Sequence, residues 1–146
     1  MAKKQKKCGK MRKKRKNDDG KPTEIARTLK EIEDSKRMCR IRVHSNEFNF
    51  SIPHDSDTAE DGTGSDVDLN VDPNDTSPLK DGTIRDPEST LGHEAVNSLA
   101  TMQGKRQSLK NKKKSELKAT GAENEHRKSK GLKQRKKYGK WNVKQH

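Results

Sequence analysis

KRQSLKNKKKSELKATGAENEHRKSKGLKQRKKYGKW, residues 105–141, is the stretch around which the rest of the sequence is arranged. Between Leu91 and His146 the chain carries 16 lysines and arginines but four acids. Its only tyrosine and its only tryptophan, Tyr138 and Trp141, lie near the end. Cations neutralise phosphates and release their counterions, and an exposed ring stacks on an unpaired base. The stretch therefore predicts nucleic-acid binding.

The side chains expected to contact nucleic acid carry a positive charge or an aromatic ring. They are Lys112, Lys113, Lys114, Lys128, Lys130, Lys133, Arg135, Lys136, Lys137, Tyr138 and Trp141. The two rings favour RNA over DNA, because stacking on unpaired bases suits loops and single strands.

The apolar content of the chain is low. Leu, Ile, Val and Phe make up 20 of 146 residues, below the roughly 20% at which disorder is expected for a highly charged chain. Ordering one residue costs roughly 1–2 kcal/mol of backbone entropy, which so few apolar side chains cannot offset. We expect a mostly intrinsically disordered chain with no globular core and one or two isolated α-helices, at about residues 23–43 and 88–119.

Charge divides the chain into parts. Residues 1–44 carry a net charge of +11, residues 45–90 of −10 and residues 91–146 of +12. Such segregation is typical of nucleic-acid-binding proteins with an acidic linker. The expected organisation is a basic arm (1–21), an amphipathic helix with a short phenylalanine motif (22–53), an acidic disordered linker (54–87), and a helix with a lysine-rich nucleic-acid-binding tail (88–146).

The basic arm has the cation density of a nuclear-import signal. The residues assigned to this signal are Lys10, Arg12, Lys13, Lys14, Arg15 and Lys16. The same cluster is also suited to binding phosphates, and the plain alternative is a solvated arm. Importins are therefore expected among the partners.

Thr23 and Glu24 predict the start of the first helix, because a threonine caps free N–H groups and an acid is favoured in the first turn. Past Cys39 the pattern alternates as in a strand, up to Ile52. We expect the helix to bind a partner's groove or lie along an RNA surface, and the extended motif to add to a partner's sheet edge or fill a pocket. The expected protein-binding residues are Ile25, Leu29, Ile32, Phe48 and Phe50. The alternative for the helix is a marginal helix without a partner. The alternative for the extended motif is a weak local hydrophobic cluster with the preceding helix.

The acidic linker contains hydroxyl residues followed three positions later by an acid, as in Ser65-Asp66-Val67-Asp68. This pattern is similar to sites of acidophilic kinases and predicts a phosphoprotein. After the linker, Asp86 and Pro87 predict the cap and first position of a second helix. Gly121 is a natural place for that helix to stop.

Signals for catalysis are missing from the sequence. There is no phosphate-binding glycine loop of the Gly-x4-Gly-Lys-Ser/Thr type, and the five histidines and two cysteines match no zinc-finger spacing. His44, His54 and Cys39 are interpreted as loop and helix residues rather than metal ligands. We expect no enzyme activity, cofactor, metal or small-molecule substrate. No apolar run approaches the length of a membrane span, and the N-terminus lacks the apolar region of a signal peptide, so we expect a soluble, intracellular protein without membrane association.

The Met-Ala-Lys start, basic ends, short helix and acidic middle are similar to small lysine-rich nucleolar proteins that accompany ribosome assembly. This resemblance rests on composition. It implies a nuclear and nucleolar, non-enzymatic factor that binds pre-ribosomal RNA together with ribosomal or pre-ribosomal proteins. A chromatin or DNA-binding protein, a regulatory interaction adaptor with import signals, and a constitutive ribosomal protein are the alternatives.

Overall fold

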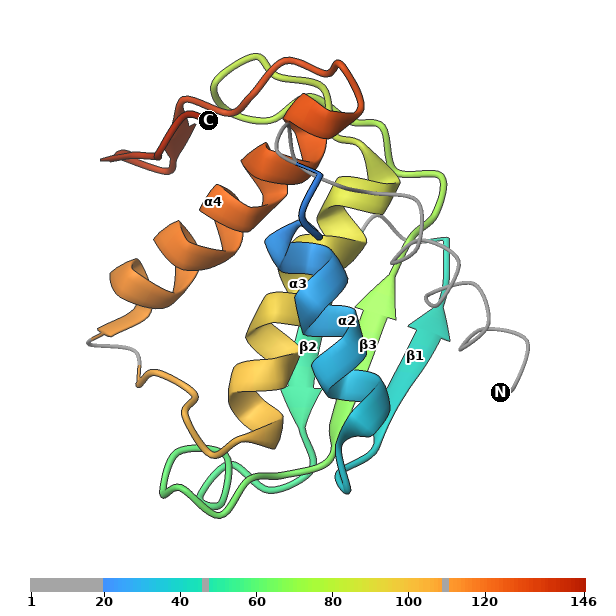
Figure 1. The fold of residues 1–146 in the computed structure, drawn as a ribbon, viewed down its shortest axis with the longest axis vertical. Helices are drawn as coiled ribbons and strands as arrows, with labels where there is room; N and C mark the ends of the chain where they lie inside the picture. Colours follow the sequence, from blue (N-terminus) through green and yellow to red (C-terminus); the bar gives the residue numbers. More distant parts are fainter. Residues whose placement is uncertain (1–19, 46–47, 109–110) are drawn as a thin grey trace.

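The computed structural model describes residues 20–45, 48–108 and 111–146. Its elements are α2 (Glu24–Asp34), β1 (Cys39–Val43), β2 (Phe50–Pro53), β3 (Val67–Val71), α3 (Pro87–Met102), α4 (Lys112–Ser129), β4 (Lys137–Tyr138) and β5 (Trp141–Asn142). Helices α2 and α3 lie against the three-stranded sheet, and α4 lies along α3 (Figure 1). The C-terminal hairpin β4–β5 stands beyond α4 (Figure 1).

The sheet is mixed, with β3 at its centre. Its order is β1-β3-β2, with β1 parallel and β2 antiparallel to β3. Alternate residues of β3, Val67, Leu69 and Val71, are buried because they face the helices. Ile41 of β1 and Ser51 of β2 lie opposite Leu69 and point to the same side. One side of the sheet therefore supplies the core.

The core brings together small numbers of apolar side chains from four elements. It contains Ile25, Leu29, Leu69, Val71, Ala95, Val96, Ala119 and Ala122. A Cβ atom added at Gly92 of α3 would lie 2.2 Å from Cδ1 of Ile25, so this glycine lets α2 approach α3 closely. Burial of one Ile or Leu side chain contributes roughly 1.5–3 kcal/mol. Alanine and glycine at the helix contacts let the helices pack closely, so that a few large side chains are enough to fill the core.

The prediction of a mostly disordered chain without a globular core was wrong. The described residues form a compact unit with many contacts between distant parts of the sequence. Residues 54–87, expected to be a disordered linker, supply the central strand β3. The composition argument failed because it averages over the chain, whereas a small core needs only a few apolar side chains placed in register.

The first predicted helix is shorter than expected, and the second is divided into two helices. The helix expected at 23–43 ends at Asp34, and residues from Cys39 onward form β1. The helix expected at 88–119 is two helices, since α3 ends at Met102 before Gly104, which has a φ of +70°. Helix α4 passes through Gly121 and ends at Ser129, so Gly121 is not a stop.

The predicted helix starts were correct. The Ala26 N–H donates to Thr23 Oγ1 at 3.3 Å, and the Ser89 N–H donates to Asp86 Oδ2 at 2.9 Å. Pro87 is the first residue of α3. Each such cap contributes about 1 kcal/mol.

The C-terminal segment is fixed to α4 by one buried amide. Asn124 accepts the Arg135 N–H at 2.7 Å through Oδ1. Its Nδ2 donates to the carbonyls of Arg135 at 2.8 Å and Lys144 at 3.0 Å. Because Asn124 is fully buried, these bonds hold both ends of the hairpin segment on the helix and position its lysines.

Candidate nucleic-acid interface and a buried polar cluster

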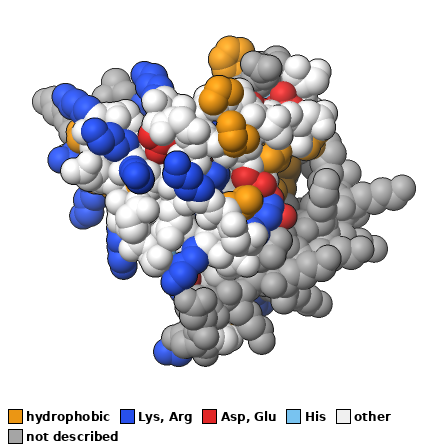
Figure 2. Space-filling view, turned by 90° about the horizontal axis from the view of Figure 1, so that it is seen from above, with side chains coloured by type: hydrophobic (Ala, Val, Ile, Leu, Met, Phe, Trp, Pro, Cys, Tyr) orange, Lys and Arg blue, Asp and Glu red, His pale blue; other side chains and the backbone are white. Residues whose placement is uncertain are grey.

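Most lysines predicted to bind nucleic acid lie on the surface. Those classed as exposed are Lys112, Lys113, Lys114, Lys128, Lys133, Lys136 and Lys137. Figure 2 views the molecule from above and shows Lys and Arg side chains spread over one part of the described surface, with few acidic side chains among them. The structure therefore presents these lysines where a polyanion can reach them.

Two of the predicted cations are engaged inside the protein. Lys130 binds Asp86 at 2.9 Å and is half-buried. Arg135 is buried, and its Nη1 lies 2.9 Å from Glu123 Oε2. Both side chains hold elements together, with Lys130 joining the end of α4 to the start of α3.

Lys112, Lys113 and Lys114 form the first turn of α4. This turn has no acidic residue, and Asn111 makes no side-chain capping bond. Cations are unfavourable there, because the helix N-terminus already carries partial positive charge. The three lysines and the positive end of the helix dipole together favour a bound anion.

The four acids between Leu91 and His146 are buried or half-buried. Glu123 is buried, and Glu94, Glu116 and Glu125 are half-buried. Glu116 and Glu123 contact His93, and Glu125 accepts the Glu24 N–H of α2 at 3.1 Å. The C-terminal third thus places its acids inward and its lysines outward.

The two aromatic rings stack on one another. The Tyr138 and Trp141 centroids are 6.4 Å apart with an interplanar angle of 9°. Tyr138 also stacks on His93 at 5.9 Å, and Arg135 lies 5.3 Å from its centroid. Burial, together with Glu116, raises the pKa of Tyr138. Trp141 therefore ends a stack of rings, with its position set by the hairpin.

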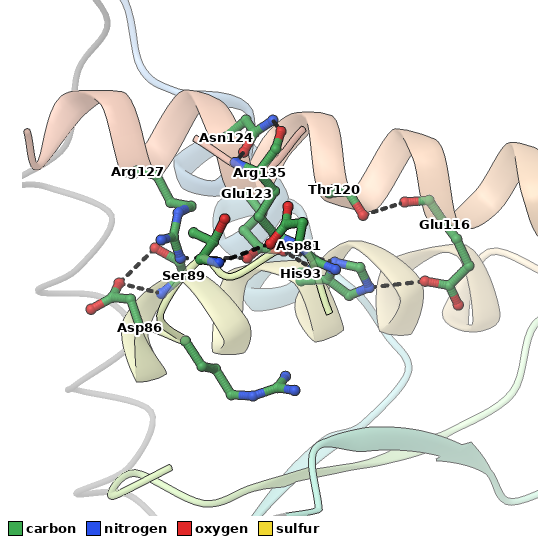
Figure 3. A network of polar contacts seen from close by, with 12 residues as sticks. Asp81, Asp86, Ser89, His93, Glu116, Thr120, Glu123, Asn124, Arg127 and Arg135 are labelled. Carbon is green, nitrogen blue, oxygen red and sulfur yellow. Dashed lines mark hydrogen bonds and ion pairs between the residues drawn. The ribbon is translucent and has the colours of Figure 1, made fainter. Parts of the chain in front are cut away.

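His93 lies at the centre of a buried polar cluster between α3 and α4. Its Nε2 is 3.0 Å from Glu116 Oε2, and its Nδ1 is 3.2 Å from Glu123 Oε2. Figure 3 shows His93 directed at Glu116, with Glu123 and Arg135 close by. Burial lowers the pKa of His93, but the two carboxylates raise it more, to about 10. Burial raises the pKa of the neighbouring Glu94 to about 7.

The sequence interpretation missed this cluster, because it treated the five histidines as dispersed. The sequence did contain one signal of a polar helix face. His93 and Asn97 are four residues apart in a helical segment, with Glu94 next to His93, and residues four apart share a face of a helix. The carboxylates of Glu116 and Glu123, two turns apart on α4, complete the cluster only when the helices pack.

The predicted protein-binding residues are divided between core and surface. Ile25 and Leu29 are buried in the protein's own core, and Ile32 packs against it. Phe48 and Phe50 are exposed, at 63% and 39%. The motif predicted to join a partner's sheet includes β2, which pairs with β3 and lies at the edge of the protein's own sheet. The import residues between Lys10 and Lys16 lie outside the described part of the chain.

On the opposite side of the sheet, Asp68 binds three basic side chains. Arg40 and His54 reach its Oδ1 at 2.9 and 2.8 Å, and Arg42 reaches its Oδ2 at 2.8 Å. The hydrogen bond from Arg40 is the largest cause that lowers the pKa of Asp68 well below its usual range, and His54 and Arg42 lower it further. This carboxylate joins β1, β3 and the end of β2.

We expect stability to fall in acid because of Asp68. A carboxyl group whose pKa is lower in the folded than in the unfolded state stabilises the protein above its unfolded pKa, about 3.9. That stabilisation is lost as pH falls below this value. Urea unfolding between pH 5 and pH 2.5 should show a steep loss in the wild type and a shallower one in Asp68→Asn. Equal pH dependence in both proteins would contradict this expectation.

Comparison with protein-family models, with curated proteins and with solved structures found no match. Among the described helices, none combines the length and apolarity needed to span a membrane.

Proposed function

We propose that the protein is a non-enzymatic RNA-binding factor whose C-terminal third binds phosphates. The inward acids and outward lysines of residues 91–146 carry this proposal. A surface of mixed charge would repel phosphates near each glutamate. Here Glu116 and Glu123 bind His93, Glu123 also binds Arg135, and Glu125 accepts an N–H of the α2 backbone. Three of the four glutamates are thus engaged within the protein, and Asp81, which accepts the Lys136 N–H at 3.1 Å, lies beside the C-terminal lysines.

The first turn of α4 is the strongest part of this surface. Lys112, Lys113 and Lys114 combine three positive charges with the positive end of a helix dipole. Lys133, Lys136, Lys137 and Lys140, all exposed, extend the charge along the C-terminal segment. RNA is favoured over DNA because Trp141 ends a ring stack, where a further unpaired base can add.

We place this factor in the nucleus and nucleolus, in association with pre-ribosomal RNA and proteins. The basic clusters Lys10–Lys16 and Lys128–Lys137 supply import and retention signals in this proposal. Exposed Phe48 and Phe50 offer apolar contacts to a protein partner. Replacing the cations of the first cluster and the exposed lysines of the second, Lys128, Lys133, Lys136 and Lys137, with alanine should leave a fluorescently tagged chain cytoplasmic.

Salt dependence tests the phosphate contacts directly. The logarithm of affinity should fall linearly with the logarithm of salt concentration, by about 0.7 per phosphate on single strands and about 0.9 on duplexes. Replacing Lys112, Lys113 and Lys114 together with alanine should flatten this slope by roughly 2–3 units and weaken all sequences similarly. Filter binding to single-stranded and duplex RNA across a salt series measures both effects.

A matched control uses three exposed lysines from elsewhere. Lys30→Ala, Lys36→Ala and Lys80→Ala together change the net charge equally, but these residues lie on or after α2 and in the loop before α3. Their slope should change by less than about 1 unit. Equal slopes for the two triple variants would refute the assignment of phosphate contacts to the start of α4.

A further inference from the structure

The loop between β3 and α3 reaches the C-terminal segment through one carboxylate. Residues 77–85 of this loop form a hairpin, in which the Arg85 N–H donates to the Ser77 carbonyl at 3.0 Å. Asp81 lies at the tip of the hairpin. Its Oδ2 accepts the Lys136 N–H at 3.1 Å, across 55 residues of sequence. Figure 1 shows the loop and the C-terminal segment side by side at the top of the molecule.

The Asp81 carboxylate is bound in the way that a separate anion would be. Its Oδ1 accepts the Thr83 N–H at 3.0 Å within the loop. Burial raises the pKa of Asp81, but hydrogen bonds from Thr83 and from the N–H groups of Lys136 and Lys137 lower it more, to about 2. Successive backbone N–H groups that converge on one anion make concavities that bind phosphate in many proteins. The carboxylate therefore occupies an anion site of the C-terminal segment.

The side chains of the same short segment are cationic. Lys133, Lys136 and Lys137 are all exposed. Charge-assisted hydrogen bonds from lysines and from backbone N–H groups are among the strongest that a phosphate group makes. The single negative charge of Asp81 balances only part of the positive charge of these three lysines.

The two N–H groups are positioned by bonds that do not involve Asp81. The adjacent Arg135 N–H donates to Asn124 Oδ1 at 2.7 Å, and Asn124 is fully buried on α4. The Lys136 carbonyl accepts the Val143 N–H at 3.0 Å. The anion site therefore keeps its shape when the loop tip leaves it, so that another anion can enter.

We propose that the N–H groups of Lys136 and Lys137, with the lysine side chains of this segment, form a phosphate subsite that the Asp81 carboxylate occupies until a phosphate group displaces it. This inference rests on the proposed RNA-binding function and adds a means of regulating it. The phosphate group comes from the RNA backbone or from a free polyphosphate, which offer the same chemistry. Because carboxylate and phosphate compete for the same N–H groups, the loop lowers the affinity for both ligands.

Asp81→Asn tests this competition, because the amide oxygen still accepts the Thr83 N–H whereas the negative charge is lost. The full chain is titrated with sodium tripolyphosphate, followed by the NMR signals of the Lys136 and Lys137 amides, and with single-stranded RNA in filter binding. Asp81→Asn should bind both ligands about three- to tenfold more tightly than the wild type, since a site that is occupied internally is available for only a fraction of the time. In the wild type, the same amide signals should shift at higher tripolyphosphate concentration.

Asp57→Asn is the matched control, because it removes the same charge from an exposed aspartate. The loop 54–66, which contains Asp57, lies at the opposite end of the molecule from the loop 77–85 (Figure 1). Its affinity for both ligands should stay within about twofold of the wild type, because salt screens exposed charges that are distant from the site.

Unchanged tripolyphosphate affinity in Asp81→Asn, or the same gain in both variants, would overturn the proposal. Tripolyphosphate binding that leaves the Lys136 and Lys137 amide signals unmoved would also overturn it. A gain for tripolyphosphate in Asp81→Asn, with no RNA binding by any of the three proteins, would support the phosphate subsite and contradict the proposed RNA-binding function.

Discussion

Glu123→Ala should lower the free energy of unfolding by about 3–5 kcal/mol, which is the cost of removing one member of a buried ion pair. The Glu123 side chain is 3% exposed and contacts His93 at 3.2 Å and Arg135 at 2.9 Å. Without it, the Arg135 guanidinium stays buried beside a positively charged His93. A loss of this size removes a large part of the roughly 5–15 kcal/mol that stabilises a typical domain.

Urea unfolding followed by circular dichroism measures this loss. Glu33→Ala is the control, because Glu33 is an exposed glutamate on α2 and the substitution is the same. It should change stability by no more than about 0.5 kcal/mol. A loss below about 1 kcal/mol in Glu123→Ala would show that the cluster contributes little to stability.

Gly104→Ala should also destabilise the fold strongly, because the loop before β3 packs directly on this glycine. The Gly62 N–H donates to the Gly104 carbonyl at 3.0 Å. A Cβ atom at Gly104 would lie 2.4 Å from the carbonyl carbon of Gly62, closer than real contacts allow. The φ of +70° adds strain of roughly 1–2 kcal/mol for any other residue.

Gly131→Ala separates these two costs. Gly131 has a φ of +72°, and a Cβ atom there would meet nothing within 4 Å. It should therefore lose only the roughly 1–2 kcal/mol of backbone strain. Gly104→Ala should lose a further 1–3 kcal/mol, roughly the cost of overpacking. Thermal unfolding of both variants measures the difference, and equal losses would exclude a steric role for the Gly62–Gly104 contact.

Local structure could be predicted from the sequence wherever residues close together in the chain determine it. The helix caps at Thr23 and Asp86 form as expected. The change from helical to strand period near Cys39 also appears, as β1. These features depend on hydrogen bonds and side-chain spacing within a few residues.

The candidate RNA interface was readable only in part. The lysines and arginines of this interface, and their number, can be listed from the sequence. The sequence does not show which of them face solvent. Arg135 and Lys130 are as basic as their neighbours, yet both are paired internally with Glu123 and Asp86. That difference arises from the packing of α4 on α3.

The sequence by itself determined the charge segregation, the helix starts and the strand period of residues 39–52. Only the tertiary structure decided that the chain has a core, because β1 and β2 must find β3 across the acidic segment, with Cys39 opposite Val67. It also decided that His93 meets Glu116 and Glu123, 23 and 30 residues away. Such contacts close long loops, whose entropy cost is recovered only when the sheet and helices pack together.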